Sequence, residues 1–213
     1  MDDIVKTGGA KIGLVRASWP FATLTVNKNM LRLNASIVGN LYFRPSDIIS
    51  IEPSWGISGA GIQINHRVEK YNSKVVFLTS GGGEIISKIV ASGFLNNFDP
   101  LPTDLEAEIE RYQSGGSFPL KWPAVIAVGV IWNVLFLGDW FGFFGNNNHI
   151  PIGAGSKGAL AFVFLFALML LISQPFRGLV LKPGRTVNDI KAFLLFLMLL
   201  TGIIFLGTSF IPK

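Results

Sequence analysis

The chain has 213 residues, enough for one or two domains, and half of them are hydrophobic. It contains no cysteine, which excludes disulfide bonds, thiolate catalysis and cysteine metal sites. The net charge is +5, but the first 120 residues hold eleven basic and eleven acidic side chains, so the excess belongs to the remainder. Because the first half has no basic stripe, we expect no nucleic-acid binding.

Alternation of apolar and polar residues predicts a series of short β-strands in the first eighty residues. Ala22, Leu24 and Val26 share one face of a strand, and Leu31 and Leu33 share a face of the next. Turn-forming residues or a proline separate the segments. The predicted strands lie around residues 12–18, 21–26, 30–34, 40–44, 47–55, 59–66 and 74–79.

The segment 74–94 has the order strand, glycine run, helix, which is also the order of a phosphate-binding loop. Gly81–Gly83, however, lacks the lysine and the serine or threonine that must follow, and several strands precede the first helix. We therefore predict a turn into a helix over Gly83–Ser92, with Ser80 as its N-cap and Gly93 ending it. Its apolar stripe consists of Ile85, Ile86, Ile89 and Val90.

A run of strands closed by one amphipathic helix resembles the pleckstrin-homology-like (PH-like) family, including its bacterial and GRAM-type members. The likeness covers about residues 8–95 and rests on the strand pattern and on phrases such as "SWPFATLTVNKNMLRL" and "GNLYFRPSDIISIE". The resemblance implies an α+β domain in which an antiparallel β-barrel or sandwich is capped at one open end by a C-terminal helix. It also implies spaced basic residues around the first strands; here these would be Arg16, Lys28 and Arg32, without a tight matching motif.

Residues 96–121 read as a linker that contains a short acidic helix. Thr103 and Glu106 have the spacing of a capping box, and Leu105, Ile109 and Tyr112 fall on one helical stripe. Residues 115–117, "GGS", form a hinge before the next part of the chain.

Three long apolar runs follow, and they predict an all-α membrane domain over 122–213. The predicted transmembrane helices cover about 122–144, 158–176 and 190–211. The second run is the shortest, so a two-span alternative, with this run re-entrant, stays open.

The distribution of positive charge predicts the orientation in the membrane. The connection between the first two runs has one lysine, whereas the connection 177–191 has Arg177, Lys182, Arg185 and Lys191. Basic loops stay in the cytoplasm. We therefore expect a multi-pass protein of the cell (inner) membrane, with the N-terminal domain cytoplasmic and the C-terminus outside. The start of the chain lacks the features of a signal peptide.

Candidate site residues are few. Within the runs, Asn133 and Asp139 are polar, and intramembrane polar groups mark function or helix contacts. In the first domain, the basic cluster "NHRVEKYNSK" could face anionic lipid or a protein partner, or could be a solvated loop. Its candidate binding residues are His66, Arg67, Lys70 and Lys74.

No catalytic constellation, metal motif or cofactor motif is evident, so we expect no enzyme. The predicted function is a membrane-anchored cytoplasmic PH-like domain that acts as a binding or scaffold module for a protein or anionic-lipid partner. The alternative is an oligomeric channel or transport accessory subunit gated by the soluble domain.

Overall fold

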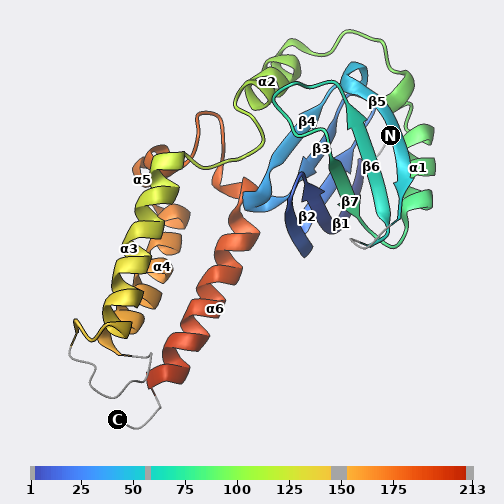
Figure 1. Ribbon diagram of the computed structural model, residues 1–213. Coiled ribbons are helices and arrows are strands. Elements are labelled where there is room, and N and C mark those ends of the chain that lie inside the picture. The colour runs from blue at the N-terminus through green and yellow to red at the C-terminus, as the bar shows by residue number, and fades with distance from the viewer. Residues whose placement is uncertain (1–2, 56–58, 145–152, 210–213) are drawn as a thin grey trace. The chain divides into compact units, whose positions relative to one another are not determined.

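The computed structural model describes residues 3–55, 59–144 and 153–209 and divides into two compact units (Figure 1). The first unit comprises residues 1–119 together with 183–185, and the second comprises 120–182 and 186–213. The predictions for the loop after the first span and for the C-terminus, residues 145–152 and 210–213, concern parts of the chain outside the described residues.

The described residues of the first unit form a curled antiparallel half-barrel of seven strands. The strands are β1 Ile4–Ile12, β2 Val15–Val26, β3 Leu31–Asn34, β4 Asn40–Phe43, β5 Ile48–Ser54, β6 Gly61–His66 and β7 Val75–Leu78. Their order in the sheet is β4-β3-β2-β1-β7-β6-β5, so β1 pairs with both β2 and β7. Short 3-10 helices, Ser36–Val38 and Pro45–Asp47, separate β3, β4 and β5.

The predicted inward faces are confirmed for the strands. Ala22, Leu24 and Val26 are buried on β2, and Leu31 and Leu33 are buried on β3. Alternation identified these faces correctly because one face of the sheet packs on the core while the other stays exposed. The helix α1 (Gly82–Ala91) contacts β5 and β6 and adds Ile85 and Ile89 to the same core.

The number of strands was predicted correctly, but two of the strands were misplaced. The segments predicted at 12–18 and 21–26 form one long strand, β2, and the strand β1 was missed. The sequence of β1 is "IVKTGGAKI", and its glycines and lysines give no clear alternation. The glycines are required: a Cβ on Gly8 would lie 2.5 Å from the Leu78 carbonyl oxygen and 2.7 Å from the Phe77 ring.

Both predicted N-terminal helix caps in this unit are wrong. The N-cap of α1 is Gly81, without a side-chain hydrogen bond, so Ser80 does not cap it. The helix α2 (Thr103–Ser114) begins at Thr103, with Pro102 as N-cap, so Thr103 is already inside the helix and cannot accept from residue 106 as a cap. The end of α1 is as predicted, because Gly93 has a φ of 75° and Phe94 is buried behind it.

In its described residues, the second unit contains three apolar helices, each long enough to cross a membrane: α3 Trp122–Trp140, α4 Ala154–Ile172 and α6 Lys191–Ser209. α4 packs against both α3 and α6. A short helix, α5 Gln174–Val180, follows α4 directly, and a 3-10 turn, Val187–Asp189, precedes α6.

The bounds of α4 differ from the apolar run 158–176. The helix includes the polar residues Ser156 and Lys157 in its first turns, and it stops at Ile172. The stop has a local cause, because Pro175 cannot continue a helix and Ser173 instead caps the start of α5, accepting from the Phe176 N–H at 3.4 Å.

Candidate functional site

The basic loop between β6 and β7 presents three cations to solvent. Arg67, Lys70 and Lys74 are all exposed, and the Lys70 ammonium donates to the Ser114 carbonyl oxygen at 3.0 Å. The loop backbone is fixed at both ends, because Arg67 N–H donates to the Asp47 carbonyl and Gly13 N–H donates to the Lys74 carbonyl. The loop therefore holds its charges on a defined backbone.

His66 belongs to a different environment. Its ring is half-buried, with its centroid 5.0 Å from that of Phe43 and 6.1 Å from that of Tyr71. Nδ1 accepts from the Val68 N–H at 3.2 Å, so the proton of the neutral ring must be on Nε2, which lies 2.9 Å from the Asn72 carbonyl oxygen. Both hydrogen bonds are satisfied by this one neutral tautomer, which makes His66 an organiser of the loop.

This arrangement predicts a pH dependence of stability. Burial lowers the pKa of His66 below its ordinary 6.5, although the hydrogen bond to the Asn72 carbonyl opposes the shift. The unfolded chain titrates near 6.5 and thus binds a proton more readily than the folded chain. The free energy of unfolding should therefore decrease as the pH falls from about 6.5 towards the folded-state pKa, and this group should contribute no pH dependence above that window.

The measurement is the free energy of unfolding of the full chain in detergent, followed between about pH 7.5 and pH 5, for the native protein and for His66→Gln. Glutamine does not titrate, so the variant should have a flatter profile, whereas His149 is present in both proteins. Equal slopes for the two proteins would show that His66 does not cause the dependence.

A cluster of two tyrosines and two arginines lies beside the basic loop between β6 and β7. The rings of Tyr42 (β4) and Tyr112 (α2) stack with centroids 4.0 Å apart and planes 23° from parallel. The Arg185 guanidinium lies over the Tyr112 ring at 4.3 Å, and the Arg32 guanidinium lies over Tyr42 at 5.1 Å. Two cations thus enclose two stacked rings, an arrangement in which both ring faces stabilise positive charge.

Arg185 is buried, with 8% of its surface exposed, and its guanidinium donates to three backbone carbonyls. It reaches Asn40 at 3.3 Å and Tyr112 at 3.4 Å, and it also bonds the Gly116 carbonyl. The charge pattern assigned Arg185 to a basic membrane flank. The structure instead places it within the first unit, to which the chain returns at 183–185 before it enters α6.

These contacts complete the outer edge of the sheet. β4 is an edge strand, and the outward N–H and C=O groups of Asn40 and Tyr42 would be unpaired without other partners. Asn40 N–H donates to the Ser117 carbonyl, and Tyr42 N–H donates to the Tyr71 hydroxyl at 3.3 Å. Arg185 and Gln113 donate to the two carbonyls. Strand addition by another chain is thereby blocked at β4.

The Tyr71 hydroxyl, which accepts from the Tyr42 N–H at the edge of β4, remains protonated at any physiological pH. Burial raises the pKa of the Tyr71 phenol to about 12. Burial likewise raises the pKa of Tyr42. Residues of the cluster come from β3, β4, the 66–74 loop, α2 and the 183–185 segment, so no local sequence pattern could reveal it. The predicted stripe of α2 was the one signal, since Ile109 and Tyr112 are buried as expected.

In the second unit, Asp139 caps α4. Its side chain, 1% exposed, accepts through Oδ2 from the Gly153 N–H and, at 3.1 Å, from the Ser156 N–H. At the other end, Arg177 donates to the carbonyl oxygens of Leu170, at 2.8 Å, and Leu171. A carboxylate at the N-terminus and a guanidinium cation at the C-terminus complement the helix dipole. They also pair terminal backbone N–H and C=O groups, to which lipid hydrocarbon offers no hydrogen bond.

Removal of the Asp139 cap should destabilise α4. We expect Asp139→Ala to cost about 1–2 kcal/mol and Asp139→Asn less, because an amide oxygen also accepts at an N-cap. The measurement is hydrogen exchange of the Gly153 and Ser156 amides in the full chain in nanodiscs, which should be faster in Asp139→Ala. Equal protection of these amides in the two variants and the native protein would contradict the capping role.

Asn133 lies on the exposed face of α3, and its Nδ2 donates to the Gly129 carbonyl of the same helix at 2.7 Å. Asn133 thus bonds within its own helix, whereas Asp139, six residues further along, caps the neighbouring helix α4. Among the described residues, no group of three or more His, Asp or Glu side chains is placed to hold a metal ion.

Comparison of the chain with protein-family models, with curated proteins and with solved structures finds no match.

Proposed function

We propose that this chain is a membrane-anchored binding or scaffold module, in which a PH-like domain is held at the cytoplasmic face of the inner membrane. The observation that carries the proposal is the joining of two self-sufficient parts: a β unit with its own core and helices apolar enough to span a bilayer. The anchor keeps the β unit next to the membrane, and the exposed basic loop gives it a surface for an anionic partner.

The architecture of the first unit supports the PH-like assignment. The seven strands curl into a half-barrel, and α1 follows the last strand and packs Ile85 and Ile89 into its core. A barrel capped by a C-terminal helix is what the resemblance implies. Because side chains already pair the outer backbone groups of β4, the proposal assigns recognition to the exposed basic loop and not to this strand edge.

The arrangement of the second unit supports a cytoplasmic location for the first. Lys121 precedes α3, and its ammonium donates to the Gly178 carbonyl of α5 at 2.6 Å. The start of α3 thus lies beside the connection that carries Arg177, Lys182 and Lys191, whereas Lys157 is at the start of α4. Basic residues therefore gather at the end where the chain enters from the β unit, and such ends stay in the cytoplasm.

Anionic lipid is the partner that the proposal puts first. Each cation near an anionic surface adds about 1 kcal/mol, so three exposed cations are sufficient for measurable, salt-sensitive contact. The test is lysine acylation, read by mass spectrometry, on the full chain in nanodiscs of neutral lipid and of lipid with added phosphatidylserine. We expect slower acylation of Lys70 and Lys74 in the anionic discs, and the protection should disappear at high salt.

The matched variants are a triple reversal, Arg67→Glu with Lys70→Glu and Lys74→Glu, and a control, Lys6→Glu, at another exposed position of the unit. In the triple variant, chemical cross-linking to anionic lipid headgroups should fall, whereas the control should behave as the native chain. Equal acylation in neutral and anionic discs would reject lipid as the partner and leave a protein ligand to be captured through the same loop.

A further inference from the structure

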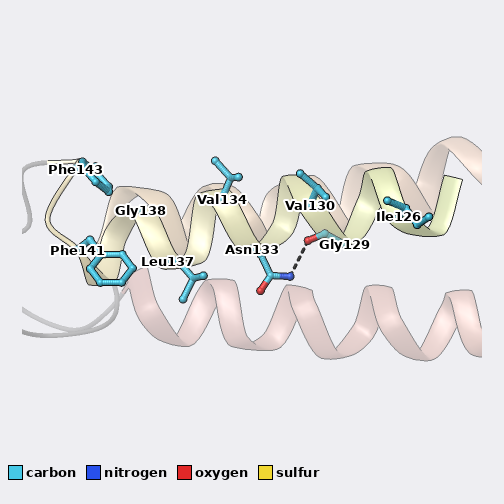
Figure 2. Close-up of a pocket in the computed structure, with 9 residues that line it drawn as sticks. All are labelled: Ile126, Gly129, Val130, Asn133, Val134, Leu137, Gly138, Phe141 and Phe143. Carbon is cyan, nitrogen blue, oxygen red and sulfur yellow. Dashed lines mark hydrogen bonds between the residues drawn. The ribbon is translucent and has the colours of Figure 1, made fainter. Parts of the chain in front are cut away.

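The exposed face of α3 carries an open groove of about 560 Å³ (Figure 2). Ile126, Val130, Asn133 and Leu137 line it, and all four side chains are exposed. Their spacing of four, three and four residues places them on one seam of the helix, the pattern by which one helix packs along another. The groove therefore has the geometry of a helix-packing surface.

Asn133 makes this surface costly to leave in contact with lipid. With a rise of 1.5 Å per residue, it lies about 3 Å from the middle of α3, well inside the hydrocarbon region. One amide N–H bonds the Gly129 carbonyl, but the carboxamide oxygen has no partner among the described residues. Lipid tails offer no hydrogen bonds, so this oxygen requires a donor from elsewhere.

The polar side chains of Asp139, Ser156 and Thr201, also inside the described spans, are buried within the second unit. Asp139 and Ser156 meet at the start of α4, and the Thr201 hydroxyl is buried and donates to the Leu197 carbonyl at 2.7 Å. Asn133 differs from them in being both central and exposed. The packing of a single chain does not explain why this polar side chain is exposed in the middle of an apolar helix.

We propose that the groove is the contact surface for α3 of a second copy of this chain, with the two Asn133 carboxamides hydrogen-bonded across a twofold axis. Copies of one protein insert in the same direction, so the axis is parallel to the membrane normal and places the same residue of both copies at the same depth. A carboxamide carries a donor and an acceptor, so it is complementary to itself. A different membrane protein would need a polar group at this same depth.

Gly129 allows the two helices to approach closely. A Cβ at this position would have no atom within 4 Å, so the space beside the Gly129 backbone is open. Small residues beside a polar one are the usual composition of helix contacts in membranes. The inference concerns the membrane unit and does not depend on what the β unit binds.

The absence of cysteine gives a direct test. Single-cysteine variants Val130→Cys and Leu137→Cys, in the full chain reconstituted in vesicles, should form disulfide-linked dimers on mild oxidation. Ile131→Cys is the matched control, because it is also exposed and lies at nearly the same depth but on another side of α3. Dimers at 130 and 137 with little at 131 support the proposal. Equal cross-linking at all three positions overturns it.

Cross-linking reports only that two helices are close, so a second measurement determines how much Asn133 contributes to the dimer affinity. Energy transfer between donor- and acceptor-labelled full chains, diluted with lipid, gives the apparent dimer affinity in vesicles. Asn133→Leu should weaken it about 3- to 30-fold, the range measured for interhelical hydrogen bonds of this kind. Asn133→Gln should retain most of the affinity, because it keeps the amide.

Gly129→Leu should abolish the dimer by filling the groove, and Gly207→Leu, on α6, is its control, since a Cβ there also meets open space. These substitutions remove no packing contact, so loss of folding is not expected. Energy transfer that is unchanged in Asn133→Leu and Gly129→Leu, or a strict monomer at every lipid ratio, overturns the proposal.

Discussion

Replacement of Gly61 by alanine is expected to prevent the first unit from folding. A Cβ at Gly61 would clash with the Phe77 carbonyl oxygen of β7 and lie 3.0 Å from the Leu78 Cα, and neither backbone group can move without breaking the β6–β7 pairing. We expect the free energy of unfolding to fall by more than about 3 kcal/mol, a large fraction of the stability of a domain of this size. The measurement is hydrogen exchange of the β6 and β7 amides in the full chain.

The matched control is Gly83→Ala, in the first turn of α1, where a Cβ would have no atom within 4 Å. Alanine is the better helix former, so this variant should be as stable as the native chain or more stable by up to about 1 kcal/mol. If Gly61→Ala retained native protection of β6 and β7, the close approach of these strands would not be essential.

Replacement of Arg185 by alanine should have the second-largest effect. It removes a guanidinium that donates to three carbonyls and stacks on Tyr112, and it leaves the Asn40 carbonyl of the edge strand without its donor. Hydrogen bonds of charged groups contribute about 1.5–3 kcal/mol each to stability. Because water can replace some of these bonds, we expect the free energy of unfolding to fall by about 2–4 kcal/mol. Exchange of the Asn40 and Tyr42 amides should accelerate.

Arg185→Lys should recover less than half of this loss, because a single ammonium cannot reach the same three acceptors and stack on the ring. Arg67→Ala is the control, since its side chain is exposed while its backbone N–H, which bonds Asp47, is unchanged. A native exchange profile in Arg185→Ala would show that β4 is sealed by other groups.

The errors of the sequence interpretation share one physical origin. The strand β1 was missed because Gly8 and Gly9 serve contacts with β2 and β7, which belong to the folded sheet and leave no periodicity. Arg185 was counted as a membrane flank because its charge is visible in the sequence and its three carbonyl acceptors are not. His66 was grouped with its cationic neighbours, although its ring packs on Phe43.

The sequence alone determined what depends on local patterns: the alternating strand faces, the stripe of α2, the division into a polar and an apolar half, and helices long enough to cross a bilayer. These features follow from side-chain periodicity and run length, which a chain displays before it folds. Only the tertiary structure decided which polar groups pair. The seal of β4 joins residues up to 145 apart, the cap of α4 comes from another helix, and the exposure of Asn133 depends on which faces of α3 are covered, because hydrogen bonds and burial are properties of neighbours in space.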